Sequence, residues 1–97
     1  MYGTVAKLRL KPGTEQQLVE QTKQYETMNV PGFVASYVYR MDNNPNEFML
    51  TVLFVDKATY TANANNPAQN ERYMKMRALL ESDPEWNDGE VVYARQS

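Results

Sequence analysis

The 97-residue chain contains no cysteine and no histidine. The absence of cysteine excludes disulfide bonds and thiolate metal sites. The absence of histidine removes the commonest metal ligand, the commonest general base and the usual haem ligand. Catalysis would therefore depend on Tyr, Asp, Glu, Lys, Arg or Asn side chains, or on the reactivity of the substrate itself. We expect neither a cofactor nor a metal.

An excess of charge of one sign is also missing, since the formal net charge is −2. The basic residues are scattered, so nucleic acid and anionic membranes are not expected partners. No apolar run reaches the roughly 18 residues of a membrane span. The first ten residues alternate like a strand and lack the apolar core of a signal peptide. We expect a cytoplasmic protein with one domain, residues 1–97.

Polar and apolar side chains alternate over residues 2–11, which predicts a first strand. One face of this strand contains Thr4, Ala6, Leu8 and Leu10. Pro12-Gly13 ends it. Thr14 and Gln17 fit a capping box and predict a helix over about residues 14–28. The apolar side of that helix contains Leu18, Thr22, Tyr25 and Met28.

Residues 32–41 and 47–55 predict a β-hairpin, joined by the turn-forming residues 42–46. One face of its first strand contains Phe33, Ala35, Tyr37, Tyr39 and Met41. The other face contains Val34, Ser36, Val38 and Arg40. The second strand, EFMLTVLFV, is apolar on both faces.

Two helices and a last strand complete the pattern. Asp56 can cap a short helix over residues 57–65. Asn66-Pro67 then ends it and begins a second helix that runs to about residue 82, because proline suits a first helical turn. The buried side of the second helix contains Tyr73, Met76 and Leu80. Asp83-Pro84 ends it, residues 85–89 form a turn, and residues 89–96 predict a fourth strand.

The resulting order, β-α-β-β-α(α)-β, predicts an α+β ferredoxin-like fold with an antiparallel sheet and helices on one face. The middle strands are apolar on both faces, which is not expected of a sheet with one face in water. The helices cover one face only. We therefore expect a homodimer formed through the open sheet face.

Four short segments carry a resemblance to a known family: K-P-G after the first strand, P-G-F before the second, F-V-D after the third, and the tail P-E-W-N-D-G-E-V-V over residues 84–92. Together they resemble the antibiotic biosynthesis monooxygenase-like family of the dimeric α/β-barrel superfamily. The resemblance implies two facing sheets in a homodimer and a pocket between sheet and helices in each subunit.

The same resemblance implies a range of functions. The family includes cofactor-free oxygenases of polycyclic phenols and quinols, haem-degrading oxygenases and members with no known reaction. Where many members have Trp at the end of the third strand, this chain has Phe54, and where they have His in the phrase A-H it has Ala62-Asn63. The haem-degrading residues would fall on Ala6, Asn63 and Tyr73, and none matches. Haem degradation is therefore disfavoured.

Asn63 and Tyr73 are the candidate catalytic residues. Asn63 is either a pocket amide that orients a phenolic or carbonyl oxygen, or a solvated residue near a helix end. Tyr73 is either a hydrogen-bond donor or base in the same pocket, or a buried aromatic residue. The candidate substrate-binding residues are Tyr37, Tyr39, Phe54 and Met76.

Other residues have alternatives of their own. Tyr37 and Tyr39 either line the pocket or meet the partner subunit. Arg40 either binds an anionic substrate or pairs with a carboxylate at the rim. Trp86 fits a hydrophobic plug or dimer contact better than a catalytic role. The acidic residues of the tail fit a solvated turn, and these are Asp83, Glu85, Asp88 and Glu90.

These observations lead to two hypotheses. In the first, the protein is a cofactor-independent monooxygenase-like enzyme that binds a small aromatic or apolar substrate between sheet and helices. The substrate would supply the electrons to oxygen, and Asn63 and Tyr73 would anchor it. The alternative is a non-catalytic small-molecule-binding protein or a structural homodimer on the same scaffold.

Overall fold

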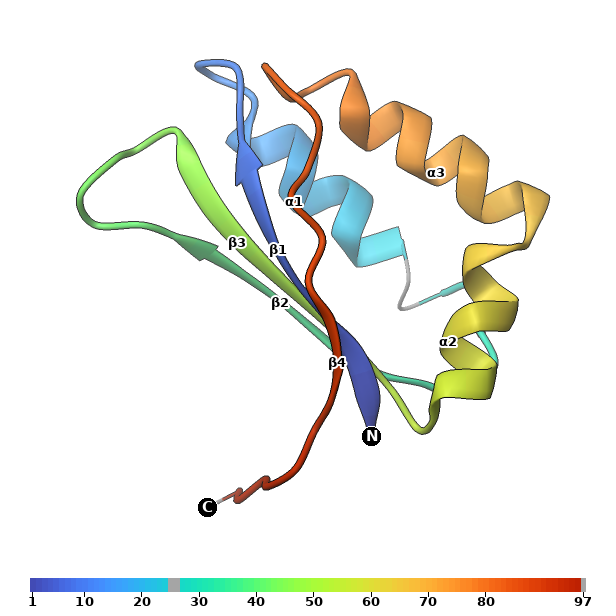
Figure 1. Cartoon of the computed structure of the whole chain (residues 1–97). Coiled ribbons are helices and arrows are strands. Elements are labelled where there is room, and N and C mark those ends of the chain that lie inside the picture. Colours follow the sequence, from blue (N-terminus) through green and yellow to red (C-terminus); the bar gives the residue numbers. More distant parts are fainter. Residues whose placement is uncertain (25–26, 97) are drawn as a thin grey trace.

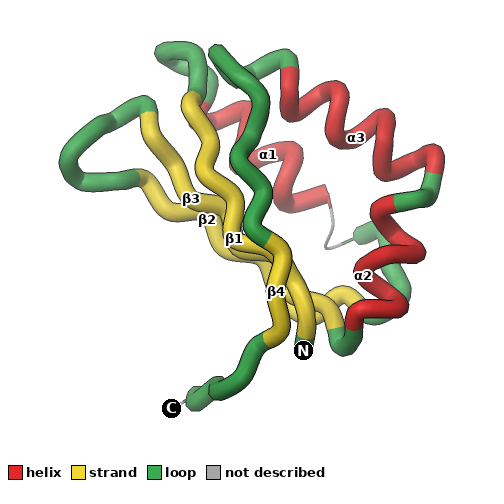
Figure 2. The backbone as a smooth tube through the Cα atoms, viewed as in Figure 1, coloured by secondary structure: helices red, strands yellow, loops and turns green. Residues whose placement is uncertain are grey.

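The computed structural model describes residues 1–24 and 27–96 (Figure 1). The elements are β1 (Tyr2–Arg9), α1 (Glu15–Lys23), β2 (Phe33–Arg40), β3 (Glu47–Phe54), α2 (Lys57–Ala64), α3 (Pro67–Arg77) and β4 (Asp88–Glu90). In this part of the chain, four strands form one antiparallel sheet in the order β2-β3-β1-β4. Figure 2 shows the helices together on one side of the sheet. The predicted ferredoxin-like α+β fold is confirmed.

The predicted core face of β1 is confirmed. Thr4, Ala6, Leu8 and Leu10 are all buried. Antiparallel pairing places Ala6 beside Leu50, and Leu8 beside Phe48, on the helix-facing side. The buried cluster consists of Ala6, Leu8, Leu10, Leu18, Phe48, Leu50 and Leu80. No helix within the described residues has the length and apolar character needed to cross a membrane.

Helix α1 is shorter than predicted, since it ends at Lys23 and not near residue 28. Thr14 occupies the N-cap position but makes no capping bond, and its hydroxyl donates to the Lys11 carbonyl at 2.7 Å. The predicted capping box is therefore wrong. Beyond the helix, Asn29 has a positive φ of 48° and residues 27–29 form a turn. The predicted helical position of Tyr25 lies outside the described residues.

The predicted β2–β3 hairpin is confirmed, with one change of face. The register shifts between Phe33 and Ala35, so a bulge interrupts the alternation. Phe33 then pairs with Phe54, and the two rings pack edge to face at 5.9 Å. The prediction that Phe33 shares a face with Tyr37 is therefore wrong, because the bulge moves Phe33 to the helix side.

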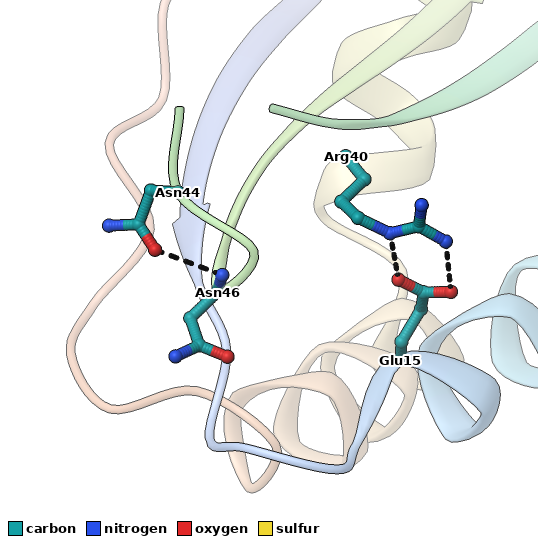
Figure 3. Close-up of polar contacts among 4 residues, drawn as sticks. All are labelled: Glu15, Arg40, Asn44 and Asn46. Carbon is teal, nitrogen blue, oxygen red and sulfur yellow. Dashed lines mark hydrogen bonds and ion pairs between the residues drawn. The ribbon is translucent and has the colours of Figure 1, made fainter. Parts of the chain in front are cut away.

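Two polar contacts fix the hairpin and its approach to α1 (Figure 3). In the turn, the Asn46 N–H donates to Asn44 Oδ1 at 3.0 Å. The Arg40 guanidinium donates to both carboxylate oxygens of Glu15, at 2.6 and 2.8 Å. These hydrogen bonds lower the pKa of Glu15. Of the two roles considered for Arg40, the structure has the ion pair at the rim.

The helix–helix junction is as predicted. Asp56 Oδ1 accepts the Thr59 N–H at 2.8 Å at the start of α2. Asn66 Oδ1 accepts the Ala68 N–H at 2.9 Å at the start of α3, with Pro67 as its first residue. Proline therefore lies where its missing N–H loses no helical bond.

Helix α3 ends at Arg77, before the predicted residue 82. The chain then turns toward the sheet, where Leu80 forms a bridge with Leu10. The Glu81 N–H donates to the Arg9 carbonyl at 2.9 Å. The Glu81 N–H thus bonds to β1 in place of a helical carbonyl.

The fourth strand begins earlier than predicted. Residues Glu85 and Lys7 exchange two backbone hydrogen bonds of 3.0 Å, so the predicted turn at residues 85–89 is extended chain along β1. Pairing ends where the Val91 N–H donates to the Met1 carbonyl. The predicted strand over residues 89–96 is wrong beyond this point, because β1 begins at Tyr2 and offers no further partner. The following residues leave the sheet beyond the N-terminus (Figure 1).

Candidate functional site

A cavity of about 460 Å³ lies between the sheet and the helices. Its walls come from the helix-facing sides of β1 and β3, from all three helices, and from the extended segment around β4. This volume falls within the range of small-molecule sites. The cavity is the part of the described structure where side chains of six different elements converge.

The floor of the cavity is apolar. Leu50, Val52 and Phe54 of β3 contribute to it, with Leu18 of α1 and Met76 of α3. Phe54 is 1% exposed, and its ring also packs edge to face on Tyr60. Phe54 and Met76, both predicted to bind substrate, therefore line the cavity as packed walls.

Asn63 lies in the cavity beside an arginine that the sequence analysis did not single out. Arg72 Nη2 donates to Asn63 Oδ1 at 3.3 Å, and Arg72 Nε donates to Gln69 Oε1 at 3.0 Å. A guanidinium can only donate, so the amide oxygen of Asn63 faces Arg72. The amide nitrogen of Asn63 is then the group available to donate to a ligand. All three side chains line the cavity.

Tyr73 also lies in the cavity, next to Trp86. The two ring centroids are 6.2 Å apart at an interplanar angle of 48°. Tyr73 projects from α3, whereas Trp86 belongs to the chain that runs along β1 toward β4. Trp86 thus forms part of the cavity wall, which differs from its predicted place in a turn.

A second polar group of the cavity comes from α2 and β4. The Tyr60 hydroxyl donates to Asp88 Oδ1 at 2.8 Å. Burial, together with this hydrogen bond, raises the pKa of Tyr60 to about 12. The nearby Thr4 hydroxyl acts in the opposite direction on the pKa of Tyr60, and within the described part of the chain Thr4 Oγ1 is buried with no partner at hydrogen-bonding geometry. The predicted turn is wrong for Asp88, which belongs to a strand and lines the cavity, whereas its predicted exposure to solvent is confirmed.

Tyr37 and Tyr39 do not line this cavity. They are 51% and 54% exposed, and β-pairing aligns them with Thr51 and Met49, away from the helices. The prediction that they contact a substrate in the pocket is corrected to a place on the open sheet face. The reason is alternation, since Ser36 and Val38 occupy the helix-facing positions of β2.

Two residues missed as site residues by the sequence analysis, Tyr60 and Asp88, had recognisable signals. Tyr60 and Asn63 are three apart and share one face of α2. Trp86 and Asp88 are two apart, which places them on one side of an extended segment. That signal was hidden because Pro84, Asn87 and Gly89 favour a turn.

The cavity's chemistry suits an organic ligand more than a metal. Among the described residues, no group of three acidic side chains is placed to hold a metal ion. The available groups are instead a guanidinium, the ammonium of Lys75, amides, hydroxyls and one carboxylate around an apolar floor. Such a set can orient an aromatic molecule and stabilise a negative charge on its oxygen.

Solved structures share this architecture. SnoaB, a cofactor-independent oxygenase from Streptomyces nogalater, has a TM-score of 0.80 at 15% identity, covering 96% of this chain and 94% of that one. A conserved protein from Methanosarcina mazei gives 0.76 at 21% identity, covering 91% and 89%. A protein of unknown function from Nitrosomonas europaea gives 0.74 at 21% identity, covering 99% and 93%. At these identities the likeness shows the fold.

Family membership follows from the sequence match. No curated protein matches the chain significantly. The sequence pattern of the antibiotic biosynthesis monooxygenase family matches residues 1–71, from β1 into the first turns of α3. This match spans most of the 97 residues. The chain belongs to the antibiotic biosynthesis monooxygenase family.

Proposed function

We propose that the protein is a cofactor-independent monooxygenase that acts on a small phenol or quinol bound in the cavity. The observation that carries this proposal is the Arg72–Asn63 pair, which presents hydrogen-bond donors to a cavity with an aromatic wall. Membership of the family and the fold shared with SnoaB, a cofactor-independent oxygenase, support the reaction type.

The reaction needs no electrons from the protein. A phenol that has lost its hydroxyl proton can pass electrons to O₂ from its own ring. One oxygen atom then enters the ring carbon, the other leaves as water, and the phenol becomes a quinone. Two hydrogens leave the substrate in that water, so atoms and electrons balance without a further reductant.

The protein's part is to favour the substrate anion. Arg72 supplies a positive charge, and the amide nitrogen of Asn63, oriented by Arg72, donates to the same oxygen. Tyr73 and Trp86 form an aromatic wall against the ring. The apolar floor excludes water, which strengthens both polar interactions.

The test is oxygen consumption by the purified protein with a panel of phenols and naphthoquinols. We expect turnover with at least one member, and a loss of about 100-fold in kcat for Asn63→Ala, the usual cost of one such donor. Asn43→Ala is the matched control, because Asn43 is an exposed residue of the β2–β3 turn. No oxygen uptake with any member, or equal rates in both variants, would contradict the proposal.

Binding without turnover is the second candidate function. It is favoured by the lack of any histidine in the sequence, which leaves no imidazole to take the substrate proton. The oxygen assay separates the two functions, since a binding protein would take up a phenol of the panel without consuming oxygen.

We also propose that the protein forms a homodimer through the open sheet face. Two rows of side chains on the open sheet face, Val5–Thr51–Tyr37 and Lys7–Met49–Tyr39, combine apolar and aromatic residues with one threonine and one lysine. Val5, Tyr37 and Tyr39 are all exposed, and aromatic residues are enriched at interfaces. A second copy of the chain would cover this face.

Light scattering tests whether the protein is a dimer. We expect a dimer at micromolar concentration and a monomer for Tyr37→Asp. Tyr93→Asp, in the exposed tail after β4, is the control and should remain dimeric. A monomeric wild-type protein would be the contrary result.

A further inference from the structure

We propose that Asp88 is the acceptor for a hydroxyl group of the substrate, and that this carboxylate makes the cavity selective for hydroxylated aromatic ligands. The inference rests on the proposed function in one respect, namely that a small aromatic molecule occupies the cavity. It concerns a contact made by β4, separate from the Arg72–Asn63 pair of the two helices.

The sheet places Asp88 in the cavity wall. In the β1–β4 ladder Asp88 pairs with Thr4, whose side chain is buried on the helix-facing side. Residues directly opposite in a ladder point to the same face. Asp88 therefore points toward the helices, as does Trp86 two residues earlier. Both side chains line the cavity.

Tyr60 fixes the carboxylate and leaves part of it available. The Tyr60 hydroxyl donates to Oδ1 at 2.8 Å. A carboxylate has two oxygens and about four acceptor positions. Oδ2 of Asp88 makes no hydrogen bond that we observe within the described residues. It can accept a further donor from the cavity side.

Tyr60 is suited to donate this hydrogen bond to Asp88 at neutral pH. Its ring packs on Tyr2 and Phe54, at centroid distances of 5.2 and 5.7 Å. The pKa of its hydroxyl is raised to about 12, chiefly by burial. The hydroxyl thus keeps its proton at neutral pH and continues to hold Asp88 in one orientation.

Such a site discriminates between ligands because a carboxylate that is left without a hydrogen-bond donor makes binding less favourable. A ligand hydroxyl would donate to Asp88 in a charge-assisted hydrogen bond. Asp88 is exposed to solvent, so a methyl ether, which has no proton to donate, would displace part of the carboxylate's hydration without compensation. A site built around a hydrogen bond rejects the ligand that cannot make it.

The proposed contact between the ligand and Asp88 is made by the C-terminal part of the chain. The family pattern matches residues 1–71, whereas Trp86 and Asp88 lie beyond it. Two members with the same first 71 positions could thus differ in ligand preference through this segment alone.

The experiment is isothermal titration calorimetry at pH 7 in anaerobic buffer, with 1-naphthol and 1-methoxynaphthalene as probes. For the wild-type protein we expect 1-naphthol to bind about tenfold more tightly or better, which is the scale of a hydrogen bond to a charged group. Asp88→Ala should reduce this preference to about twofold or less. Asp88→Asn, which keeps the shape and a weaker acceptor, should give an intermediate preference.

Two further variants test whether the preference for 1-naphthol depends on the Asp88 carboxylate itself. Asp42→Ala removes an exposed carboxylate in the β2–β3 turn and should leave the preference unchanged. Tyr60→Phe keeps the carboxylate but removes the hydroxyl that orients it, so its preference should lie between those of the wild-type protein and Asp88→Ala. Circular dichroism of each variant verifies that it is folded.

The outcomes distinguish this inference from the proposed function. If both probes bind equally to the wild-type protein, or if the preference survives in Asp88→Ala and disappears in Asn63→Ala, the inference is overturned while cavity binding stands. If neither probe binds, the inference and the proposed binding of a small aromatic substrate both fail.

Discussion

The two ends of the layer between sheet and helices differ in how they are filled. At one end Leu8, Leu10, Phe48 and Leu80 pack together, and each is at most 2% exposed. At the other end lies the cavity, bordered by tyrosines, amides and Arg72. Figure 1 shows α1 and the end of α3 near the end of β1, and α2 near its beginning. One layer thus has a closed half and a hollow half.

The difference suggests that the closed half stabilises the fold and that the hollow half binds a ligand. Close-packed apolar side chains stabilise the fold in the closed half. The hollow half keeps polar atoms that packing does not satisfy, since Thr4 Oγ1 and Gln21 Oε1 are buried and find no hydrogen-bond partner among residues 1–24 and 27–96. Such groups lower the stability of the fold. We interpret them as groups retained for contact with a ligand.

The largest expected effect is on stability, in the closed half. Leu8→Ala should lower the free energy of unfolding by about 2–5 kcal/mol, because Leu8 is fully buried in the cluster and its truncation leaves a void. Urea denaturation measures this. Val55→Ala, at an exposed position after β3, is the control and should change stability by less than about 0.5 kcal/mol. A similar loss in both would contradict the comparison.

A smaller effect, on binding, is expected in the hollow half. Trp86→Ala should weaken the binding of 1-naphthol about tenfold, because it removes the aromatic wall beside Tyr73. The unfolding free energy should fall much less than for Leu8→Ala, since Trp86 is partly exposed. Calorimetric titration and denaturation measure the two quantities. Tyr93→Ala, in the exposed tail, should affect neither.

The smallest effect is confined to alkaline pH. The pKa of Tyr60 is raised from 10.0 to about 12 in the folded protein. Between these values the unfolded chain loses a proton that the folded protein keeps, so stability falls as pH rises. Below pH 10 the contribution is complete and constant. Tyr60→Phe should therefore flatten the stability profile between pH 10 and 12, as followed by denaturation; an unchanged slope would contradict the assignment.

The sequence predicted the fold well because its signals are local and repeated. Alternation identified the buried face of β1, and Asn66-Pro67 identified the helix junction. Its errors concern the places where one bond between distant segments overrides a local pattern. The chain around Trp86 has turn-forming residues, yet hydrogen bonds to Lys7 keep it extended.

The site was only partly predictable for the same reason. Asn63, Tyr73, Phe54 and Met76 were proposed from position in the chain, and all four line the cavity. Their functional roles stay predictions. The spacing of Trp86 and Asp88 indicates a shared side, but which side faces the helices depends on the register of β4 against β1, which no local pattern specifies.

The most direct test is a crystal structure of the protein soaked anaerobically with 1,4-dihydroxynaphthalene. Our account predicts the ring in the hollow half beside Tyr73 and Trp86. One ligand oxygen should lie within hydrogen-bonding distance of Asn63 or Arg72. A ligand seated on the open sheet face at Tyr37 and Tyr39, or a cavity that stays empty at saturating ligand, would contradict the account.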